Sequence, residues 1–241
     1  TVSANIATAL AAEGRKVGLL DADVYGPSQP RMLGVTGRPA SPDNKTILPL
    51  RNHGVTMMSL GLMTQEDEAV VWRGPMLMGA LQQMLMQVQW GALDVLIVDL
   101  PPGTGDAQLS LAQQAHIDGA VIVTTPQKVS VHDVRKAIRM FGTVKIPVLG
   151  VVENMAYFTP PGHTEKYEIF GSGGGAAIES EFDIPLLAQL PIDLAVREGG
   201  DEGTPSVLSH PDSQFARAFM AAAEAVHERT SKLPSGEAAS T

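Results

Sequence analysis

Six short apolar runs divide this chain, and each is short enough to be one buried β-strand. They cover residues 17–20, 55–60, 93–100, 119–124, 148–153 and 186–190. Helical spacing of apolar residues appears at 2–10, 75–90, 107–115, 130–141 and 212–229. Because parallel strands need crossover connections, this alternation predicts an α/β fold with a doubly wound, mostly parallel sheet and helices on both faces. We expect one domain over residues 1–229 and a disordered, small and polar tail over 230–241.

The acidic composition narrows the possible partners. Lys and Arg total 17 against 26 Asp and Glu, a net charge of −9, and such a chain repels nucleic acid and anionic membranes. No apolar run approaches the roughly 18 residues of a transmembrane helix, and no basic leader precedes the first helix. We therefore expect a soluble, cytoplasmic protein that binds neither nucleic acid nor membrane. The chain has no cysteine, which excludes disulfides, thiolate catalysis and cysteine-ligated metal within it.

The run at 93–100 ends in a pattern typical of a magnesium site. Apolar residues lead to one carboxylate, Asp99, and Pro-Pro-Gly-Thr-Gly follows at 101–105, as in a Walker B strand with its switch loop. At the edge of a sheet Asp99 can hold Mg²⁺ through a water, because Mg²⁺ keeps much of its hydration shell. The alternative is a structural aspartate that caps the next helix.

A second pair of carboxylates, Asp21 and Asp23, follows the run at 17–20. Two residues apart on a strand, they point the same way. Asp23 can orient an attacking water, while Asp21 helps to hold the waters of Mg²⁺. The alternative is a solvated turn, since Asp, Gly, Pro and Ser at 21–28 are ordinary turn residues.

Polar or flat residues also follow the last two apolar runs. Asn154 follows 148–153, and Pro191 and Asp193 follow 186–190. An asparagine amide offers one donor edge and one acceptor edge, which suits adenine, and a proline offers a flat apolar surface to a base. The alternative is two loops that bind nothing.

Together these motifs resemble the Mrp/ApbC family, iron–sulfur cluster carrier ATPases of the deviant P-loop superfamily that includes MinD and ParA. The similar stretches are 21–28, 72–76, 99–106, 124–127, 171–175 and 197–201. Residues 1–5 resemble those that directly follow the family's phosphate-binding loop, Gly-Lys-Gly-Gly-x-Gly-Lys-Ser. The resemblance spans residues 1–228, and the motifs at 23–28 and 101–106 distinguish it from MinD and ParA.

The resemblance implies that the protein binds and hydrolyses ATP as a homodimer. It also implies a bridging [4Fe–4S] cluster that is delivered to apo iron–sulfur proteins. The site residues that it implies are Asp23 for catalysis, Asp99 and Asp21 for Mg²⁺ through water, and Thr1, Asn154, Pro191 and Asp193 for the nucleotide.

Two departures from the family pattern bear on these expectations. The sequence starts at Thr1, so we expect a chain truncated after the phosphate-binding loop, which hydrolyses ATP negligibly by itself without the loop lysines. The family's Cys-x-x-Cys is also absent, and Pro160 and His163 occupy the matching positions within 156–175, a stretch that we expect to be a loop or small hairpin. Proline cannot be a ligand and one imidazole falls far short of a thiolate set, so we expect His163 to be a loop residue without metal.

Two further hypotheses remain open. A MinD/ParA-like positioning or binding switch would need a C-terminal amphipathic membrane helix or a basic DNA-binding surface. The residues after 212–229 are Ser, Gly and Ala rich and lack a basic-aromatic stripe, which makes this the weaker hypothesis. The other possibility is that this chain is a non-catalytic fragment.

Overall fold

The computed structural model describes residues 1–63, 74–105, 108, 109, 111 and 115–233, and its strands form two sheets. The strands are β1 Val17–Asp21, β2 Leu50–Asn52, β3 Val55–Ser59, β4 Val95–Asp99, β5 Ala120–Thr124, β6 Val148–Glu153 and β7 Leu186–Gln189. One sheet has the order β2-β3-β1-β4 and the other β5-β6-β7. Every pair is parallel except β2 with β3, which confirms the mostly parallel α/β fold.

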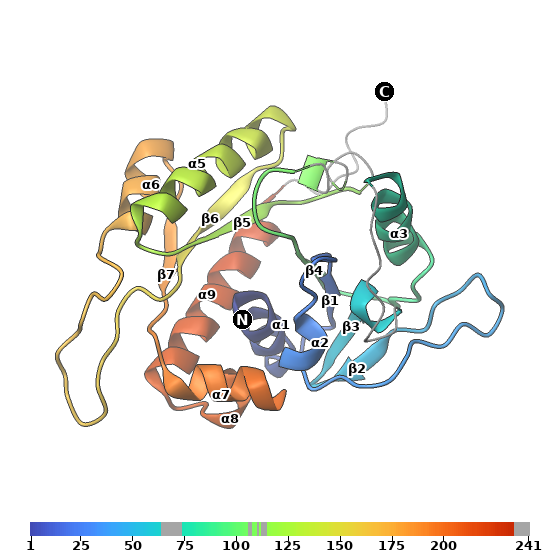
Figure 1. Ribbon diagram of the computed structural model, residues 1–241, viewed down its shortest axis with the longest axis horizontal. Coiled ribbons are helices and arrows are strands. Elements are labelled where there is room, and N and C mark those ends of the chain that lie inside the picture. Colours follow the sequence, from blue (N-terminus) through green and yellow to red (C-terminus); the bar gives the residue numbers. More distant parts are fainter. Residues whose placement is uncertain (64–73, 106–107, 110, 112–114, 234–241) are drawn as a thin grey trace.

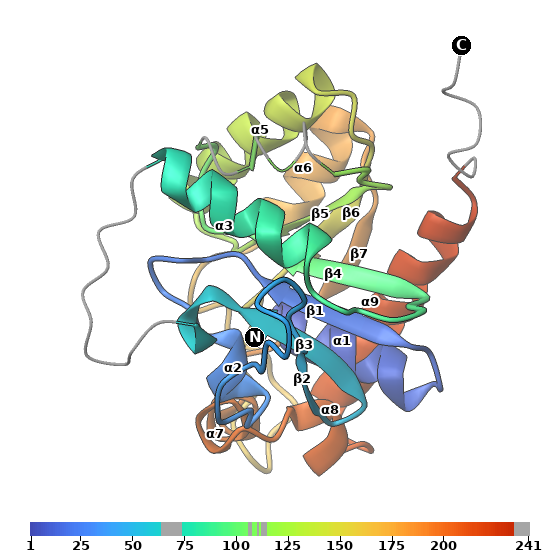
Figure 2. The same cartoon turned by 90° about the vertical axis from the view of Figure 1, so that its right-hand side faces the viewer.

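Helices cover both faces of these sheets (Figures 1 and 2). They are α1 Val2–Ala12, α2 Gln29–Met32, α3 Gly74–Met86, α5 Lys128–Thr143, α6 Gly174–Phe182, α7 Leu194–Glu202, α8 Ser206–Ser209 and α9 Gln214–Ser231, with a 3₁₀ turn at Leu60–Leu62. Helices α5 and α6 pack on the face of the β5–β7 sheet opposite α9, while α1 packs beside α9. The sheets therefore form the middle layer of three.

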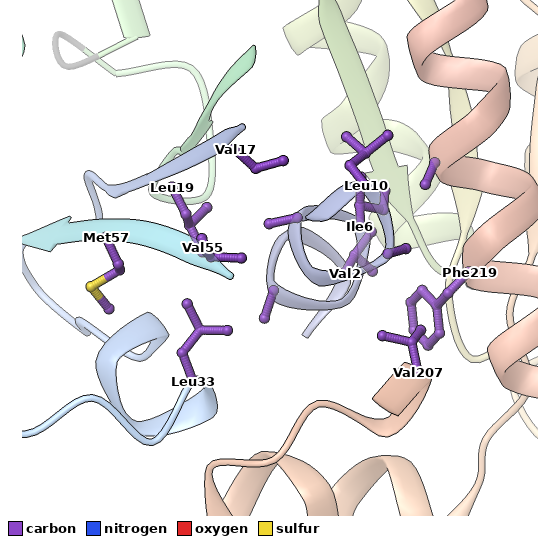
Figure 3. Packing of buried hydrophobic residues seen from close by; sticks show 14 of the residues in the cluster. Val2, Ile6, Leu10, Val17, Leu19, Leu33, Val55, Met57, Val207 and Phe219 are labelled. Atoms are coloured by element: carbon purple, nitrogen blue, oxygen red, sulfur yellow. The ribbon is translucent and has the colours of Figure 1, made fainter. Parts of the chain in front are cut away.

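Alternate residues of one strand belong to different cores, as expected when both faces of a parallel sheet are buried. Leu19 of β1 belongs to the cluster that also contains Ile6 of α1 and Phe219 of α9 (Figure 3). The next residue, Leu20, belongs to the cluster that contains Leu81 of α3. Both leucines are fully buried, which explains why this run is apolar at every position rather than at alternate ones.

The observed element boundaries differ from the predicted ones at several places. Helix α3 ends at Met86 rather than near residue 90, and α9 runs from Gln214 to Ser231, so the first residues of the predicted tail are helical. The stretches at 25–54 and after 190 contain α2, β2, α7 and α8, which apolar periodicity did not indicate because these elements are short or polar. Most of the helix predicted at 107–115 and the end of the tail lie outside the described residues.

Candidate functional site

Asp21 and Asp99 end two neighbouring strands and lie opposite each other. β1 and β4 pair in parallel from Val17 with Val95 to Asp21 with Asp99. The backbone N–H of Ala22 donates to the carbonyl oxygen of Asp99 over 2.9 Å, which holds the two strand ends together. The two aspartates that the sequence indicated as candidate magnesium residues are therefore brought together by strand register.

The Asp21 carboxylate is held by four donors. Its Oδ2 accepts from the backbone N–H of Ser28 at 3.1 Å and of Gln29 at 3.2 Å, and from the Ser59 hydroxyl at 3.1 Å. Its Oδ1 accepts from the backbone N–H of Asp23 at 3.2 Å. Asp21 is only 1% exposed, so this carboxylate fixes the turn at 21–29 from inside the protein.

The electrostatics of this cluster disfavour two negative charges. Burial raises the pKa of Asp21 to about 6, and the charge of Asp99 acts in the same direction, while the hydrogen bonds from Gln29, Ser59 and Asp23 oppose the increase. Within the part of the chain that the structure describes, no lysine or arginine forms an ion pair with Asp21 or Asp99. A divalent cation at this edge would relieve the repulsion between the two carboxylates.

Asp99 receives two side-chain hydrogen bonds that the sequence did not indicate. The hydroxyl of Ser3 in α1 donates to Oδ1, and the Gln29 side-chain amide donates to Oδ2 over 2.7 Å. Gln29 is 1% exposed, and its Oε1 has no hydrogen-bond partner among the described residues. An unpaired buried oxygen beside a carboxylate is suited to accept from a metal-bound water. The oxygen atoms of Asp21, Asp99 and Gln29 at this edge thus fit a hydrated Mg²⁺ ion.

The Asp23 side chain is part of a turn at the surface of the protein. Its Oδ1 accepts from the backbone N–H of Tyr25 and of Gly26, each at 3.2 Å, which is the turn predicted as the alternative. The side chain remains partly exposed, and the neighbouring Tyr25 is 74% exposed. Asp23 therefore lies at the surface beside the buried Asp21, where a water can reach it.

Thr1 lies at the same edge as the two aspartates. It is the N-cap residue of α1, and its carbonyl oxygen accepts from both the backbone N–H and the side-chain amide of Asn5, each at 3.1 Å. Burial lowers the pKa of the Thr1 amino group, while Asp99 and Asp21 act in the opposite direction. Because N–H groups at the start of a helix attract anions, this end of α1 suits a phosphate.

Asn154, Pro191 and Asp193 follow the strands β6 and β7 of the other sheet. The backbone N–H of Asn154 donates to the carbonyl oxygen of Thr124 at the end of β5, over 2.7 Å. The Asp193 side chain accepts from the Ala195 N–H at 2.8 Å and is the N-cap of α7. Among the described residues, no hydrogen bond joins these three to Asp21 or Asp99. The structure thus gives Asp193 a capping contact that the sequence analysis did not assign.

A buried glutamate explains why glycine stands at position 175, the last residue of the glycine-rich stretch at 171–175. Glu153, 1% exposed at the end of β6, accepts from the backbone N–H of Gly175 at 2.7 Å and from the side-chain amide of Gln189 at 2.6 Å. A Cβ at Gly175 would lie 3.2 Å from the Glu153 Cβ and 2.7 Å from Leu186. Glycine therefore lets α6 begin directly against β6, a role that apolar periodicity could not indicate.

Pro160 and His163 lie in the turn of a short hairpin. Phe158 and Tyr167 exchange backbone hydrogen bonds of 2.9 and 2.8 Å, and the His163 N–H donates to the Pro160 carbonyl at 3.0 Å. The hairpin agrees with one of the two predictions for residues 156–175. His163 is exposed, and in the described part of the chain no group of three or more His, Cys, Asp or Glu could hold a metal ion.

A family model described as ParA, "NUBPL iron-transfer P-loop NTPase", matches residues 1–227. The chain belongs to this family. A curated relative from Synechocystis named "Iron-sulfur cluster carrier protein" is 50% identical over 236 residues, which is 96% of the chain and 67% of the relative. An Escherichia coli K12 protein of the same name is 48% identical over 94% of the chain and 62% of its own length. This NUBPL-family chain thus spans roughly two thirds or less of these relatives, and the resemblance to iron–sulfur cluster carriers of the P-loop NTPase class is confirmed.

Solved structures place the fold among nucleotide-binding proteins. A nucleotide-binding protein from Archaeoglobus fulgidus, solved with ADP, is 36% identical with a TM-score of 0.77, covering 90% of this NUBPL-family chain and 85% of its own. The MinD cell division ATPase of Pyrococcus furiosus is 26% identical with a TM-score of 0.66, covering 94% of this chain and 92% of its own.

As for membranes, none of the described helices combines the length and apolar character needed to span a bilayer.

Proposed function

We propose that this chain is the nucleotide-binding part of an iron–sulfur cluster carrier, which binds and hydrolyses ATP and delivers clusters to apo-proteins. The observation that carries the proposal is the register pairing of Asp21 with Asp99 at the edge where α1 begins. It is supported by the names of relatives that are 48 to 50% identical and by the ADP-bound structural neighbour.

In the proposed site Asp99 and Asp21 hold Mg²⁺ through its waters. The ion would supply the positive charge that neutralises the phosphates. Ser3 and Gln29 orient the Asp99 carboxylate. The Oε1 of Gln29, which has no hydrogen-bond partner among the described residues, would accept a hydrogen bond from the hydrated ion. Among the described residues no lysine or arginine forms an ion pair with Asp21 or Asp99, so a bound cation would also lower the pKa of Asp21 toward its ordinary range.

The phosphates are proposed to lie on the amino end of α1. Thr1, the N-cap residue of α1, contacts the α-phosphate. Asp23, at the surface beside Asp21, orients the attacking water. Without the loop lysines, residues 1–241 alone would hydrolyse ATP negligibly, since those charges stabilise the transferring phosphoryl group.

Adenine recognition is proposed for the ends of β6 and β7. Asn154 offers its side-chain amide to the base and Pro191 a flat apolar face, while Asp193 holds the start of α7 beside them. In the ordinary carrier arrangement, two such sites would face each other in a homodimer.

The cluster itself is cargo, and this chain's residues do not fit it. The sequence has no cysteine. Of the two positions that match the family's Cys-x-x-Cys, one holds the exposed His163 and the other holds Pro160, which cannot be a ligand. A [4Fe–4S] cluster is normally held by four thiolates. The thiolates would therefore come from a part of the protein outside this chain or from a partner.

The test uses the chain extended by the loop Gly-Lys-Gly-Gly-Val-Gly-Lys-Ser, beside the same protein with both loop lysines replaced by alanine. The first should release phosphate from Mg²⁺·ATP and accelerate anaerobic cluster transfer from a cluster donor to an apo-ferredoxin, and the second should do neither. Equal ATP hydrolysis by both versions would show that the site is wrongly placed. ATP hydrolysis without any effect on transfer would favour a positioning switch of the MinD/ParA kind.

A further inference from the structure

Glu153, the last residue of β6, carries a buried carboxylate that the site around Asp21 and Asp99 does not use. Its Oε1 accepts from the Gly175 N–H over 2.7 Å, and its Oε2 accepts from the Gln189 side-chain amide over 2.6 Å. Among the residues that the structure describes, no lysine or arginine forms an ion pair with it. A carboxylate that is 1% exposed is costly unless hydrogen bonds replace its hydration. The two donors therefore hold Glu153 in one orientation.

These two donors lie on different elements, and both elements border the end of β6. Gly175 is the second residue of α6, so its N–H belongs to the positive end of that helix, where a negative charge is favoured. Gln189 is the last residue of β7 and pairs in register with Glu153. Helix α6 contacts both strands (Figure 1). One carboxylate thus fastens the carboxyl ends of β6 and β7 to each other and to the start of α6.

The main chain after Glu153 departs from regular strand pairing. The Leu190 N–H donates to the Glu153 carbonyl, and the Ala156 N–H donates to the Leu190 carbonyl, each over 2.8 Å. In a regular parallel ladder these two partners of Leu190 would be two residues apart, but here they are three apart, so one extra residue is inserted, as in a β-bulge. Met155 has φ of 53°, in the left-handed region that residues other than glycine rarely adopt. Asn154 and Met155 therefore lie outside the ladder, next to Leu190.

We propose that Glu153 is a positioning residue for base recognition, which fixes the main chain beneath Asn154 and Pro191 so that the protein distinguishes adenine from guanine. This inference rests on the proposed function, in which those two residues contact the base. Glu153 directly precedes Asn154, and Gln189, which it holds, stands two residues before Pro191. The carbonyl and the carboxylate of Glu153 both bond to the end of β7, at Leu190 and Gln189.

The physical reason is that an asparagine selects a base only if its amide is fixed. Adenine offers a donor and an acceptor on the edge where guanine offers them in the reverse order, so an amide held in one orientation pairs with one base and not the other. Hydrogen bonds weaken steeply with distance and angle, so a main chain that can shift loses this discrimination. The left-handed Met155 is a strained conformation that persists only where the surrounding contacts hold it, and the contacts of Glu153 are directly beside it.

The experiment measures the preference for ATP over GTP in the loop-extended protein, as the ratio of the kcat/KM values for phosphate release. Gln189→Ala removes the bond to β7 at an exposed residue, which should preserve the fold, and it should lower the preference by about fivefold. Glu153→Ala removes both bonds and should lower it by about tenfold or more. Glu153→Gln should retain most of the preference, because its amide keeps an acceptor for the Gly175 N–H and can donate to the carbonyl of a turned Gln189 side chain.

A second carboxylate provides the matched control. Glu179 of α6 accepts from the Leu186 N–H at 3.0 Å, so it also joins α6 to β7, but at the amino end of that strand. Glu179→Ala should leave the preference for ATP over GTP unchanged. Inorganic tripolyphosphate, which has no base, should inhibit the parent and Gln189→Ala equally, and kcat with ATP should stay the same, because only the base contacts change.

Two outcomes would overturn the role of Glu153. One is an unchanged preference in both Gln189→Ala and Glu153→Ala, and the other is an equal loss in Glu179→Ala, which would show a general effect of loosening α6. If Glu153→Ala does not fold, Gln189→Ala decides by itself. A parent protein that hydrolyses ATP without preferring it to GTP would contradict the proposed adenine site and this inference with it, whereas a parent whose preference survives in both variants contradicts only the role of Glu153.

Discussion

The side-chain amide of Gln29 donates to the carboxylate of Asp99, with Nε2 2.7 Å from Oδ2. The backbone N–H of the same glutamine donates to Asp21 at 3.2 Å. One buried residue at the start of α2 therefore contacts both carboxylates and couples the turn after β1 to the end of β4. Its Oε1, which has no partner among the described residues, can act only as an acceptor.

Two substitutions of Gln29 distinguish the effect of losing its hydrogen bond from the effect of introducing a charge at its position. Gln29→Leu should lower the free energy of unfolding by about 1–2 kcal/mol at all pH values, because Asp99 loses a buried donor. Gln29→Glu should lower the free energy of unfolding more at pH 8 than at pH 5. The introduced carboxyl is buried beside two acids, so its native pKa is raised and the stability falls as the pH rises through that value. Urea titrations at both pH values measure this, and a pH-independent cost of Gln29→Glu would contradict it.

The raised pKa of Asp21 predicts a pH dependence of stability. The native pKa is about 6 against an ordinary value of 3.8, so the native state binds the proton more tightly than the unfolded chain. The contribution of Asp21 is therefore most favourable below pH 3.8 and is lost as the pH rises through 6. At about 1.4 kcal/mol per pKa unit, the loss is up to about 3 kcal/mol.

Asp21→Asn provides the comparison, because it cannot ionise. Between pH 4 and pH 7, the free energy of unfolding of the parent protein should fall relative to that of Asp21→Asn. Saturating Mg²⁺ should reduce the shift if the ion binds there. Parallel pH profiles of the two proteins would show that Asp21 titrates normally.

The proposed roles of Asp99 and Asp23 predict different kinetic defects in the loop-extended protein. Asp99→Ala should weaken Mg²⁺-dependent nucleotide binding by about tenfold or more, since the carboxylate holds the hydrated ion. Asp23→Ala should leave binding intact and slow hydrolysis by about 10²-fold, if it positions the water. Fluorescent-nucleotide titration and single-turnover phosphate release separate the two effects. Normal hydrolysis by Asp23→Ala would assign its carboxylate to the turn alone.

Two glycines in the region of α7 offer a matched test of packing. A Cβ at Gly203, which has φ of 72°, would lie 2.4 Å from the Gly34 Cα and 3.0 Å from the Arg31 carbonyl oxygen. Gly203→Ala should therefore destabilise the protein by about 2 kcal/mol or more, because the obstacles are backbone atoms and the conformation is left-handed. Gly200, within α7, has nothing within 4 Å of its Cβ position, so Gly200→Ala should be neutral or stabilising by about 0.5–1 kcal/mol. Thermal denaturation of both variants decides this, and equal melting temperatures would refute the contact between α7 and α2.

Much of the fold follows from the sequence because buried parallel strands are apolar at every position. The runs that became β1, β4 and β6 could be located within two residues, and Asp21 and Asp99 could be expected at one edge because parallel strands end together. The sequence patterns that indicate turns and helix caps were weaker than the apolar runs that indicate strands. Asp193, proposed from the sequence as a nucleotide contact, has a capping hydrogen bond that no periodicity predicts.

Tertiary structure alone decided which strands are neighbours and which distant residues complete the site. Gln29 and Ser3 reach Asp99 from 70 and 96 residues away in the sequence, and nothing in their local patterns indicated it. The division into two sheets, with a cavity between β4 and β5, was equally invisible, since each strand has the same apolar pattern with or without a neighbour. Local sequence sets the hydrophobicity and conformation of each segment, but pairing depends on contacts between segments that only the folded chain brings together.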